Sequence, residues 1–203
     1  MSDAEGFILA GGASSRMGTD KARLSLGGRT FVERIAEALR AIATQVSVVG
    51  TRPFDGGALD LPTVADVYRD CGALGGLHAA LRACRAPWAV VVSCDLPFVT
   101  GELFARLADL RTPEADAVAP VQRDGRPQPL CALYSTARCL ERVERLLGAG
   151  ERRPRVLLRE ARTRWVEPTE LADLRDAELF FLNVNTPEDY ERAREMVKTV
   201  RCR

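Results

Sequence analysis

The stretch WAVVVS at residues 88–93 gives the clearest indication of fold in this 203-residue chain. Its central residues are apolar without alternation, which is typical of a parallel β-strand that is covered on both faces. Asp95 follows this strand after a single cysteine. Because ligands of parallel sheets bind beyond the carboxyl ends of the strands, we expect Asp95 to face a ligand crevice.

Short apolar runs alternate with amphipathic segments of helical length on both sides of this stretch. Helices are predicted at residues 31–43, 77–83, 103–110 and 137–147, and a last one after Thr186 as N-cap and Pro187. Further strands are predicted at residues 5–9, 46–49, 63–65, 117–120, 130–134 and 179–184, with a hairpin turn at 123–126. This alternation predicts an α/β fold, a doubly wound and mostly parallel sheet with helices on both faces. Since no long linker or repeat interrupts the pattern, we expect residues 1–203 to form a single domain.

The overall charge excludes partners that are recognised by a strongly basic protein. The chain has 29 Lys and Arg against 28 Asp and Glu, a net charge of +1. It therefore gives no electrostatic reason to expect nucleic acid or an anionic membrane as a partner. No apolar run approaches the ~20 residues of a membrane span, and the N-terminus lacks a signal sequence, so we expect a cytoplasmic protein.

The cysteines predict free thiols and no zinc site. None of the six lies in a C-x-x-C pair, and a chain without a secretion signal is expected to keep its thiols reduced. His78 is the single histidine, and no cysteine stands at ligand spacing from it. The cysteines are Cys71, Cys84, Cys94, Cys131, Cys139 and Cys202.

The loop after the first predicted strand has the composition of a phosphate-binding loop. It reads AGGASSRMGTDK over residues 10–21. Gly11 and Gly12 let the backbone approach a ligand, and Arg16 and Lys21 add two positive charges that suit a polyphosphate. The loop matches neither G-x-x-x-x-G-K-[ST] nor G-x-G-x-x-G. A glycine-rich turn with solvated basic residues is the alternative interpretation.

Two acidic residues follow predicted strands and are candidate ligands for Mg²⁺. Asp95 comes after residues 88–93 and Asp66 after residues 63–65. Mg²⁺ needs only one or two carboxylates when substrate phosphates and waters complete its coordination. Alternatively, Asp95 caps the helix that begins near residue 100. The second glycine-rich segment, GALGGL at 72–77, either lets a flat base approach the backbone or is a simple helix entry.

These motifs together resemble the Rossmann-like nucleotidyltransferases, and most closely the molybdenum cofactor guanylyltransferases. The resemblance covers nearly the whole chain, with its motifs in the expected order. They are FILAGG at 7–12, SRMG at 15–18, DK at 20–21, ADVYRDCGALGG at 65–76, SCDLPF at 93–98, GERR at 150–153 and NVNTP at 183–187. The GERR and NVNTP segments favour the molybdopterin branch.

The resemblance implies a Rossmann-like domain that, with Mg²⁺, transfers GMP from GTP to molybdenum-loaded molybdopterin and releases pyrophosphate. It implies a nucleotide-binding set of Leu9, Ala10, Gly11, Gly12, Lys21, Asp66 and Asp95. Arg16, Lys21 and Asp95 would be catalytic, and Asp95 would bind the metal. Asn183 and Asn185 would face the molybdopterin acceptor.

Some points depart from the family pattern or stay open. The segment VGTR at 49–52 lacks an asparagine that some members have, and RPQP at 126–129 lacks a histidine. The alternatives are CTP as donor, a sugar phosphate as acceptor, or a non-catalytic GTP-binding module. The basic segment at 152–155 is either a solvated face or a grip on the acceptor's phosphate or on a partner protein. Besides the two substrates, the resemblance implies transient contact with proteins that deliver the cofactor or mature molybdoenzymes.

Overall fold

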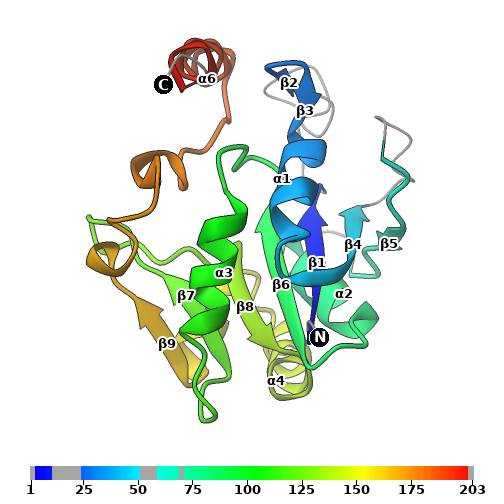
Figure 1. Cartoon of the computed structure of the whole chain (residues 1–203). Helices are drawn as coiled ribbons and strands as arrows, with labels where there is room; N and C mark the ends of the chain where they lie inside the picture. The colour runs from blue at the N-terminus through cyan, green and yellow to red at the C-terminus, as the bar shows by residue number, and fades with distance from the viewer. Residues whose placement is uncertain (1–2, 11–23, 51–58, 69–70, 201–203) are drawn as a thin grey trace.

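The computed structural model describes residues 3–10, 24–50, 59–68 and 71–200 (Figure 1). Seven strands form one sheet in the order β5-β4-β1-β6-β8-β7-β9. They are β1 (Ala4–Leu9), β4 (Ala43–Gly50), β5 (Thr63–Ala65), β6 (Trp88–Ser93), β7 (Ala117–Pro120), β8 (Cys131–Ser135) and β9 (Thr163–Val166). Among these strands, β8 alone runs antiparallel to its neighbours. The predicted α/β fold with a mostly parallel sheet is confirmed.

Helices cover both faces of the sheet, as predicted. α1 (Phe31–Leu39) and α3 (Gly101–Asp109) pack on the face that is in front in Figure 1. α2 (Gly72–Ala83), α4 (Thr136–Gly148) and α5 (Pro154–Glu160) pack on the other face. The chain passes from β1 through α1 to β4 on one side, and from β5 through α2 to β6 on the other. Such a reversal of direction opens a crevice at the carboxyl ends of the central strands.

The uninterrupted apolar runs of the central strands follow from this two-sided cover. In β1, Ile8 packs into the cluster under α1 and α3, while Phe7 and Leu9 pack into the cluster under α2 and α4. In β6, Val90 and Val92 face the first cluster and Val91 faces the second. Successive side chains of a strand point to opposite faces, so both sets must be apolar when both faces are buried.

A third, smaller hydrophobic cluster lies above the carboxyl edge of the sheet. It joins the ribbon of β2 (Ser25–Leu26) and β3 (Arg29–Thr30) to α6 (Pro187–Val200), which lies at the top of Figure 1. Tyr190 of α6 donates its hydroxyl hydrogen to the carbonyl oxygen of Ser25 at 2.7 Å. The buried members of this cluster are Leu26, Phe31, Phe98, Val184, Ala193 and Val197.

The predicted strand at residues 179–184 is wrong. Residues Ala177–Leu179 form a 3₁₀ helix, η4, and no strand follows it in this segment. The run is apolar because Phe180 is buried against the main core and Val184 is buried in the third cluster. Packing against other elements, and not sheet pairing, therefore explains its composition.

Several further elements were not predicted from the sequence, among them the short strands β2 and β3. The strand β9 pairs in parallel with β7, although Thr163 and Arg164 leave it only two apolar residues. The short helix α5 begins at Pro154, within the basic segment. A second 3₁₀ helix, η3 (Pro168–Glu170), follows β9.

Helix boundaries also differ from the prediction. α1 ends at Leu39, four residues early, because residues 40–42 form a turn in which Ala41 N donates to Ala38 O at 3.3 Å. Ile42 still packs against the core, which extended the apparent helical period. α2 begins at Gly72 and not at residue 77, since its early glycines conceal a helix in the sequence.

Several local predictions are confirmed. Thr186 Oγ1 accepts from Asp189 N at 3.1 Å as the cap of α6. The 123–126 turn connects the antiparallel strands β7 and β8, and Gly125 has a φ of 81°. Five cysteines are free thiols, and Cys202 lies outside the described residues.

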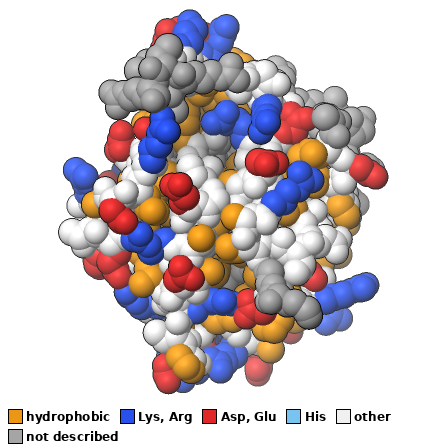
Figure 2. All heavy atoms as spheres, in the orientation of Figure 1, with side chains coloured by type: hydrophobic (Ala, Val, Ile, Leu, Met, Phe, Trp, Pro, Cys, Tyr) orange, Lys and Arg blue, Asp and Glu red, His pale blue; other side chains and the backbone are white. Residues whose placement is uncertain are grey.

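The surface and the helices add two observations. On the face shown in Figure 2, basic and acidic side chains are interspersed. Within the described residues, no helix combines the length and the apolar character needed to cross a membrane.

Candidate active site

The central strands end at the same level and bring two of the predicted motifs together. Leu9 at the end of β1 pairs with Val49 of β4 and with Ser93 of β6. Ala10 N donates to Val49 O at 2.9 Å, and Cys94 N donates to Leu9 O at 3.0 Å. The start of the glycine-rich loop and the segment that carries Asp95 are therefore adjacent at the carboxyl edge of the sheet.

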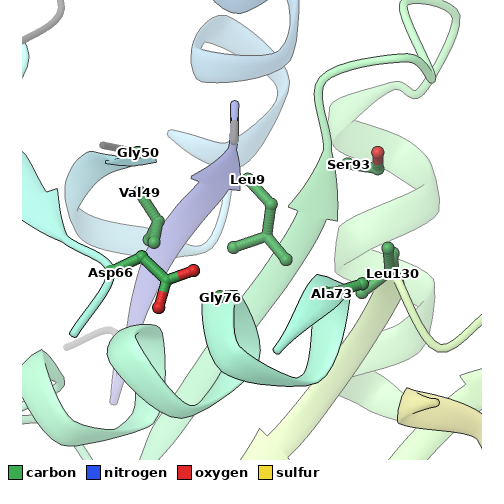
Figure 3. A pocket seen from close by; sticks show the side chains of 9 residues that line it. Leu9, Val49, Gly50, Asp66, Ala73, Gly76, Ser93 and Leu130 are labelled. Carbon is green, nitrogen blue, oxygen red and sulfur yellow. The ribbon is translucent and has the colours of Figure 1, made fainter. Parts of the chain in front are cut away.

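A pocket of about 350 Å³, including its open mouth, lies at this edge. Strand ends supply Leu9, Val49, Gly50 and Ser93, and α2 supplies Gly72, Ala73 and Gly76. Figure 3 shows the carboxylate of Asp66 directed into the pocket from the side of β5, with Ser93 and Leu130 on the opposite side. The mostly apolar wall with one carboxylate is suited to a flat heterocycle that carries hydrogen-bond donors.

Asp66 is held by its own turn. Its Oδ1 accepts from Tyr68 N at 3.0 Å. Burial raises the pKa of the Asp66 carboxyl, and the Tyr68 N–H and His78 oppose this shift to a smaller extent. The neighbouring backbone leaves no room for a side chain at Gly75, where a Cβ would lie 2.9 Å from Tyr68 O and 3.3 Å from Asp66 Oδ1. The second glycine-rich segment thus permits a close approach of α2 to the Asp66 turn.

Asp95 has the environment of a metal ligand. Its Oδ1 is one of two buried side-chain polar atoms in the described part of the chain without a hydrogen-bond partner. A buried carboxylate oxygen without a partner is costly, so such an atom calls for an explanation such as an ion. Asp95 does not cap α3, because that role belongs to Thr100, whose Oγ1 accepts from Leu103 N at 3.2 Å.

The donor set around Asp95 fits Mg²⁺ better than a metal held by the protein alone. Among the described residues, no group of three His, Cys, Asp or Glu side chains is arranged to bind a metal ion. Mg²⁺ is commonly bound by one or two carboxylates together with phosphate oxygens and water. Asp95 is therefore the residue of this edge that would hold such an ion.

The NVNTP segment reaches the same place from the end of the chain. Val184 N donates to Asp95 O at 2.9 Å, so the backbone between Asn183 and Asn185 lies against the Asp95 turn. Asn183 is exposed and Asn185 is half-buried. The structure brings these two predicted acceptor residues beside the predicted metal ligand.

The GERR segment lies at the rim of the pocket, beside the first residue of α2. A Cβ on Gly72, whose φ is +60°, would lie 3.7 Å from Arg152 O. Glu151 accepts from the guanidinium of Arg153 through Nε and Nη2, both at 2.8 Å. This pairing lowers the pKa of Glu151 to about 2. The exposed guanidinium of Arg153 is therefore held by Glu151.

Part of the predicted site cannot be described. Gly11, Gly12, Arg16 and Lys21 lie outside the described residues, as do the Thr51 and Arg52 positions. Conversely, five further residues line the pocket: Val49, Gly50, Ser93, Ala73 and Leu130. Of these, Gly50 was considered only as a base contact together with Thr51 and Ala73 only as part of the GALGGL segment, and the other three were not predicted.

Four of the five could have been identified from the sequence, because they lie at the ends of strands or at the beginning of a helix. The sequence gives no indication that Leu130 lines the pocket, because this residue reaches it through sheet pairing. Ser93 N donates to Leu130 O at 2.9 Å.

Comparisons with known proteins agree with this geometry. Residues 6–165 match the model of the MobA-like NTP transferase domain. The chain is 37% identical over 202 residues to the "Probable molybdenum cofactor guanylyltransferase" of Pelotomaculum thermopropionicum, covering 99% of this chain and 97% of that protein. It is 31% identical to the "Molybdenum cofactor guanylyltransferase" of Desulfosudis oleivorans, covering 97% and 96%. The crystal structure of molybdopterin-guanine dinucleotide biosynthesis protein A from Archaeoglobus fulgidus has a TM-score of 0.81 at 26% identity, covering 96% and 99%.

Proposed function

The chain belongs to the MobA-like NTP transferase family, and we infer that it is a molybdenum cofactor guanylyltransferase. It transfers GMP from GTP to molybdenum-loaded molybdopterin. A phosphate oxygen of the acceptor forms a bond to the α-phosphorus of GTP. The bond between the α-phosphorus and the oxygen that links it to the β-phosphate breaks, and pyrophosphate leaves. A phosphate monoester is already anionic near neutral pH, so the reaction requires no general base.

The observation that carries the proposed site is the buried Oδ1 of Asp95, without a partner, at the strand edge where the pocket opens. We assign Asp95 as the ligand of Mg²⁺, an ion that neutralises phosphate charge when it is bound. Asp95 would orient the α-phosphate side of the nucleotide toward the acceptor. Arg16 and Lys21, in the loop that begins after Ala10, would stabilise the negative charge on the departing pyrophosphate.

We assign the pocket beside Asp66 to the guanine base and ribose. Leu9, Ala10, Gly11 and Gly12 would contact the nucleotide mainly through their backbone. The Asp66 carboxylate at the pocket wall would accept hydrogen bonds from the nucleotide, which offers N–H donors on guanine and hydroxyl donors on ribose.

Asn183 and Asn185 are assigned to the acceptor side, because Val184 between them is bonded to Asp95. Their amide groups both donate and accept hydrogen bonds, as recognition of a pterin requires. For protein partners, we propose transient contact with proteins that deliver the acceptor or receive the product.

The first experiment compares the thermal stability of the protein with Mg²⁺ and GTP, CTP or ATP. A ligand at 100 times its Kd stabilises the native state by about 2.7 kcal/mol, so the preferred triphosphate gives the largest rise in Tm. We expect GTP to give the largest rise, and Asp66→Ala to reduce it. A larger rise with CTP would contradict the guanylyl assignment.

The second experiment measures pyrophosphate release with GTP and molybdenum-loaded molybdopterin. We expect pyrophosphate and the guanine dinucleotide to appear in equal amounts. Turnover with a sugar phosphate in place of molybdopterin would show that the assignment of molybdopterin as the acceptor is wrong. GTP binding without turnover on either acceptor would identify a binding module.

A further inference from the structure

We propose that Asp189 is a positioning residue for the acceptor side of the site, and that it acts by fixing the backbone of Asn185. The inference rests on the proposed function, since Asn185 is assigned there to the acceptor. Asp189 lies in the first turn of α6, outside the pocket itself.

The contacts of Asp189 extend beyond those of an ordinary helix cap. In a capping box, the side chain three residues into the helix accepts from the backbone N–H of the cap residue alone. Here Asp189 Oδ2 accepts from Thr186 N at 3.0 Å and also from Asn185 N at 3.1 Å. In return, Asp189 N donates to Thr186 Oγ1. One carboxylate oxygen thus holds two successive amides of the NVNTP segment.

The same short segment is tied to Asp95 from its other end. Val184 N donates to Asp95 O at 2.9 Å, and the Val184 side chain is fully buried beside Phe98 and Leu26. Asn185 therefore stands between two fixed points, the Asp95 turn and the Asp189 carboxylate. A side chain on so constrained a backbone has little freedom to leave its position, which is the condition for preorganised binding.

Asp189 is suited to this role because it stays ionised. The N–H of Asn185 lowers the pKa of the Asp189 carboxyl, and Arg192 and Thr186 add to this effect against partial burial. Arg192 donates to the other carboxylate oxygen, Oδ1. Oδ2 therefore remains directed at the two amides.

The test replaces Asp189 by Asn, which keeps its volume but removes the charge. We expect kcat/KM for molybdenum-loaded molybdopterin to fall about tenfold, as for loss of one hydrogen bond to a charged group, with the Kd of GTP changed less than twofold. The control is Glu191→Gln, which makes the same charge change two residues further along α6, where the side chain is exposed and pairs with Arg194. We expect this control to match the wild type in all measurements.

A double-mutant cycle then asks whether Asp189 acts through Asn185. If it does, Asp189→Asn adds little to the loss in kcat/KM already caused by Asn185→Ala. The full tenfold loss in the Asn185→Ala background would overturn the proposal. So would a parallel loss of GTP affinity, because that would indicate a general effect on the fold.

Amide hydrogen exchange gives a readout that does not depend on activity. The amides of Asn185 and Thr186 should lose protection in Asp189→Asn and keep it in Glu191→Gln. Unchanged protection of Asn185 would overturn the proposal. A wild-type protein that transfers nothing to molybdopterin would refute the proposed function, whereas an active wild type with an unaltered Asp189→Asn variant would refute this inference alone.

Discussion

The backbone N–H of Cys94 donates to the carbonyl oxygen of Leu9 at 3.0 Å, just beyond the ends of two neighbouring strands. Ala10, which follows Leu9, opens the glycine-rich loop, and Asp95, which follows Cys94, carries the buried carboxylate oxygen without a partner. Two motifs from distant parts of the chain therefore start from one point of the sheet. This adjacency is the structural basis for assigning both to one triphosphate.

Replacing Asp95 by Asn should abolish transfer without unfolding the protein. Loss of the charge removes the proposed metal ligand, and we expect the rate of pyrophosphate release to fall by about 10³ or more. Because Oδ1 is buried without a partner, the same change should leave Tm equal to or higher than that of the wild type. Thermal melts and a pyrophosphate assay on one preparation measure both effects.

The control for this prediction is Asp109→Asn, at an exposed position near the end of α3. It should keep full activity. Wild-type activity of Asp95→Asn would refute the metal assignment.

Gly75→Ala should weaken GTP binding. A Cβ there would lie 2.9 Å from Tyr68 O and 3.3 Å from Asp66 Oδ1, so the Asp66 turn must move away from α2. We expect the Kd of GTP to rise about tenfold or more, since a small displacement of a binding group is costly. Gly148→Ala is the matched control, because its Cβ would meet no atom within 4 Å. Equal GTP affinity in both variants would contradict the close approach.

Asp66→Asn should become more stable relative to the wild type as pH rises. Burial raises the pKa of Asp66 above its ordinary value of 3.8. The fold therefore favours the protonated carboxyl, whose stabilising contribution is present below pH 3.8 and lost as pH rises through the higher folded pKa. Urea unfolding between about pH 3.5 and pH 7 measures this effect. The free energy of unfolding of Asp66→Asn should rise relative to that of the wild type as pH rises.

Asp124→Asn is a control that should show the opposite trend. The backbone N–H of Arg126 lowers the pKa of Asp124, so its contribution is present above pH 3.8 and lost as pH falls. The free energy of unfolding of Asp124→Asn should therefore rise relative to that of the wild type as pH falls. The same trend with pH in both variants would contradict the two environments.

Asp116→Asn should destabilise the protein while leaving the transfer reaction intact. Asp116 is fully buried before β7, at the end of the sheet opposite the pocket, and accepts from Arg142 at 2.5 Å and Arg162 at 3.1 Å. Because both arginines are partly exposed, the substitution leaves no buried charge, and the weakened charge-assisted hydrogen bonds cost about 2 kcal/mol in the free energy of unfolding. Kinetics below the lowered Tm should give wild-type KM values.

This cost should also depend on pH. Burial alone would raise the pKa of Asp116, but hydrogen bonds from Arg162 and Arg142 outweigh burial and hold the pKa well below its usual range. The stabilisation is thus present above pH 3.8 and lost as pH falls, so the wild type and Asp116→Asn should converge in acid. Glu141→Gln, at the same cluster of arginines, should show neither a large cost nor this convergence.

The sequence alone determined the class of fold and the candidates for the site. The apolar run at 88–93 predicted a strand that is covered on both faces, and Thr186 before Pro187 predicted the start of a helix. Both predictions were possible because hydrophobic periodicity and helix capping depend on residues that are neighbours in the sequence. Asp66 and Asp95 were found for the same reason, since each lies within two residues of the end of a strand.

Only the tertiary structure decided what depends on contacts between distant residues. Residues 179–184 have the composition of a strand, yet Phe180 and Val184 are buried by packing in two different clusters. Arg164 lies in a strand although the residue type does not predict one. The strand forms because pairing with β7 stabilises β9. The bond between Val184 and Asp95 joins the acceptor segment to the metal ligand, and Leu130 reaches the pocket beside Ser93. Local preferences are written in adjacent residues, whereas pairing and burial depend on the free energy of the whole packed chain.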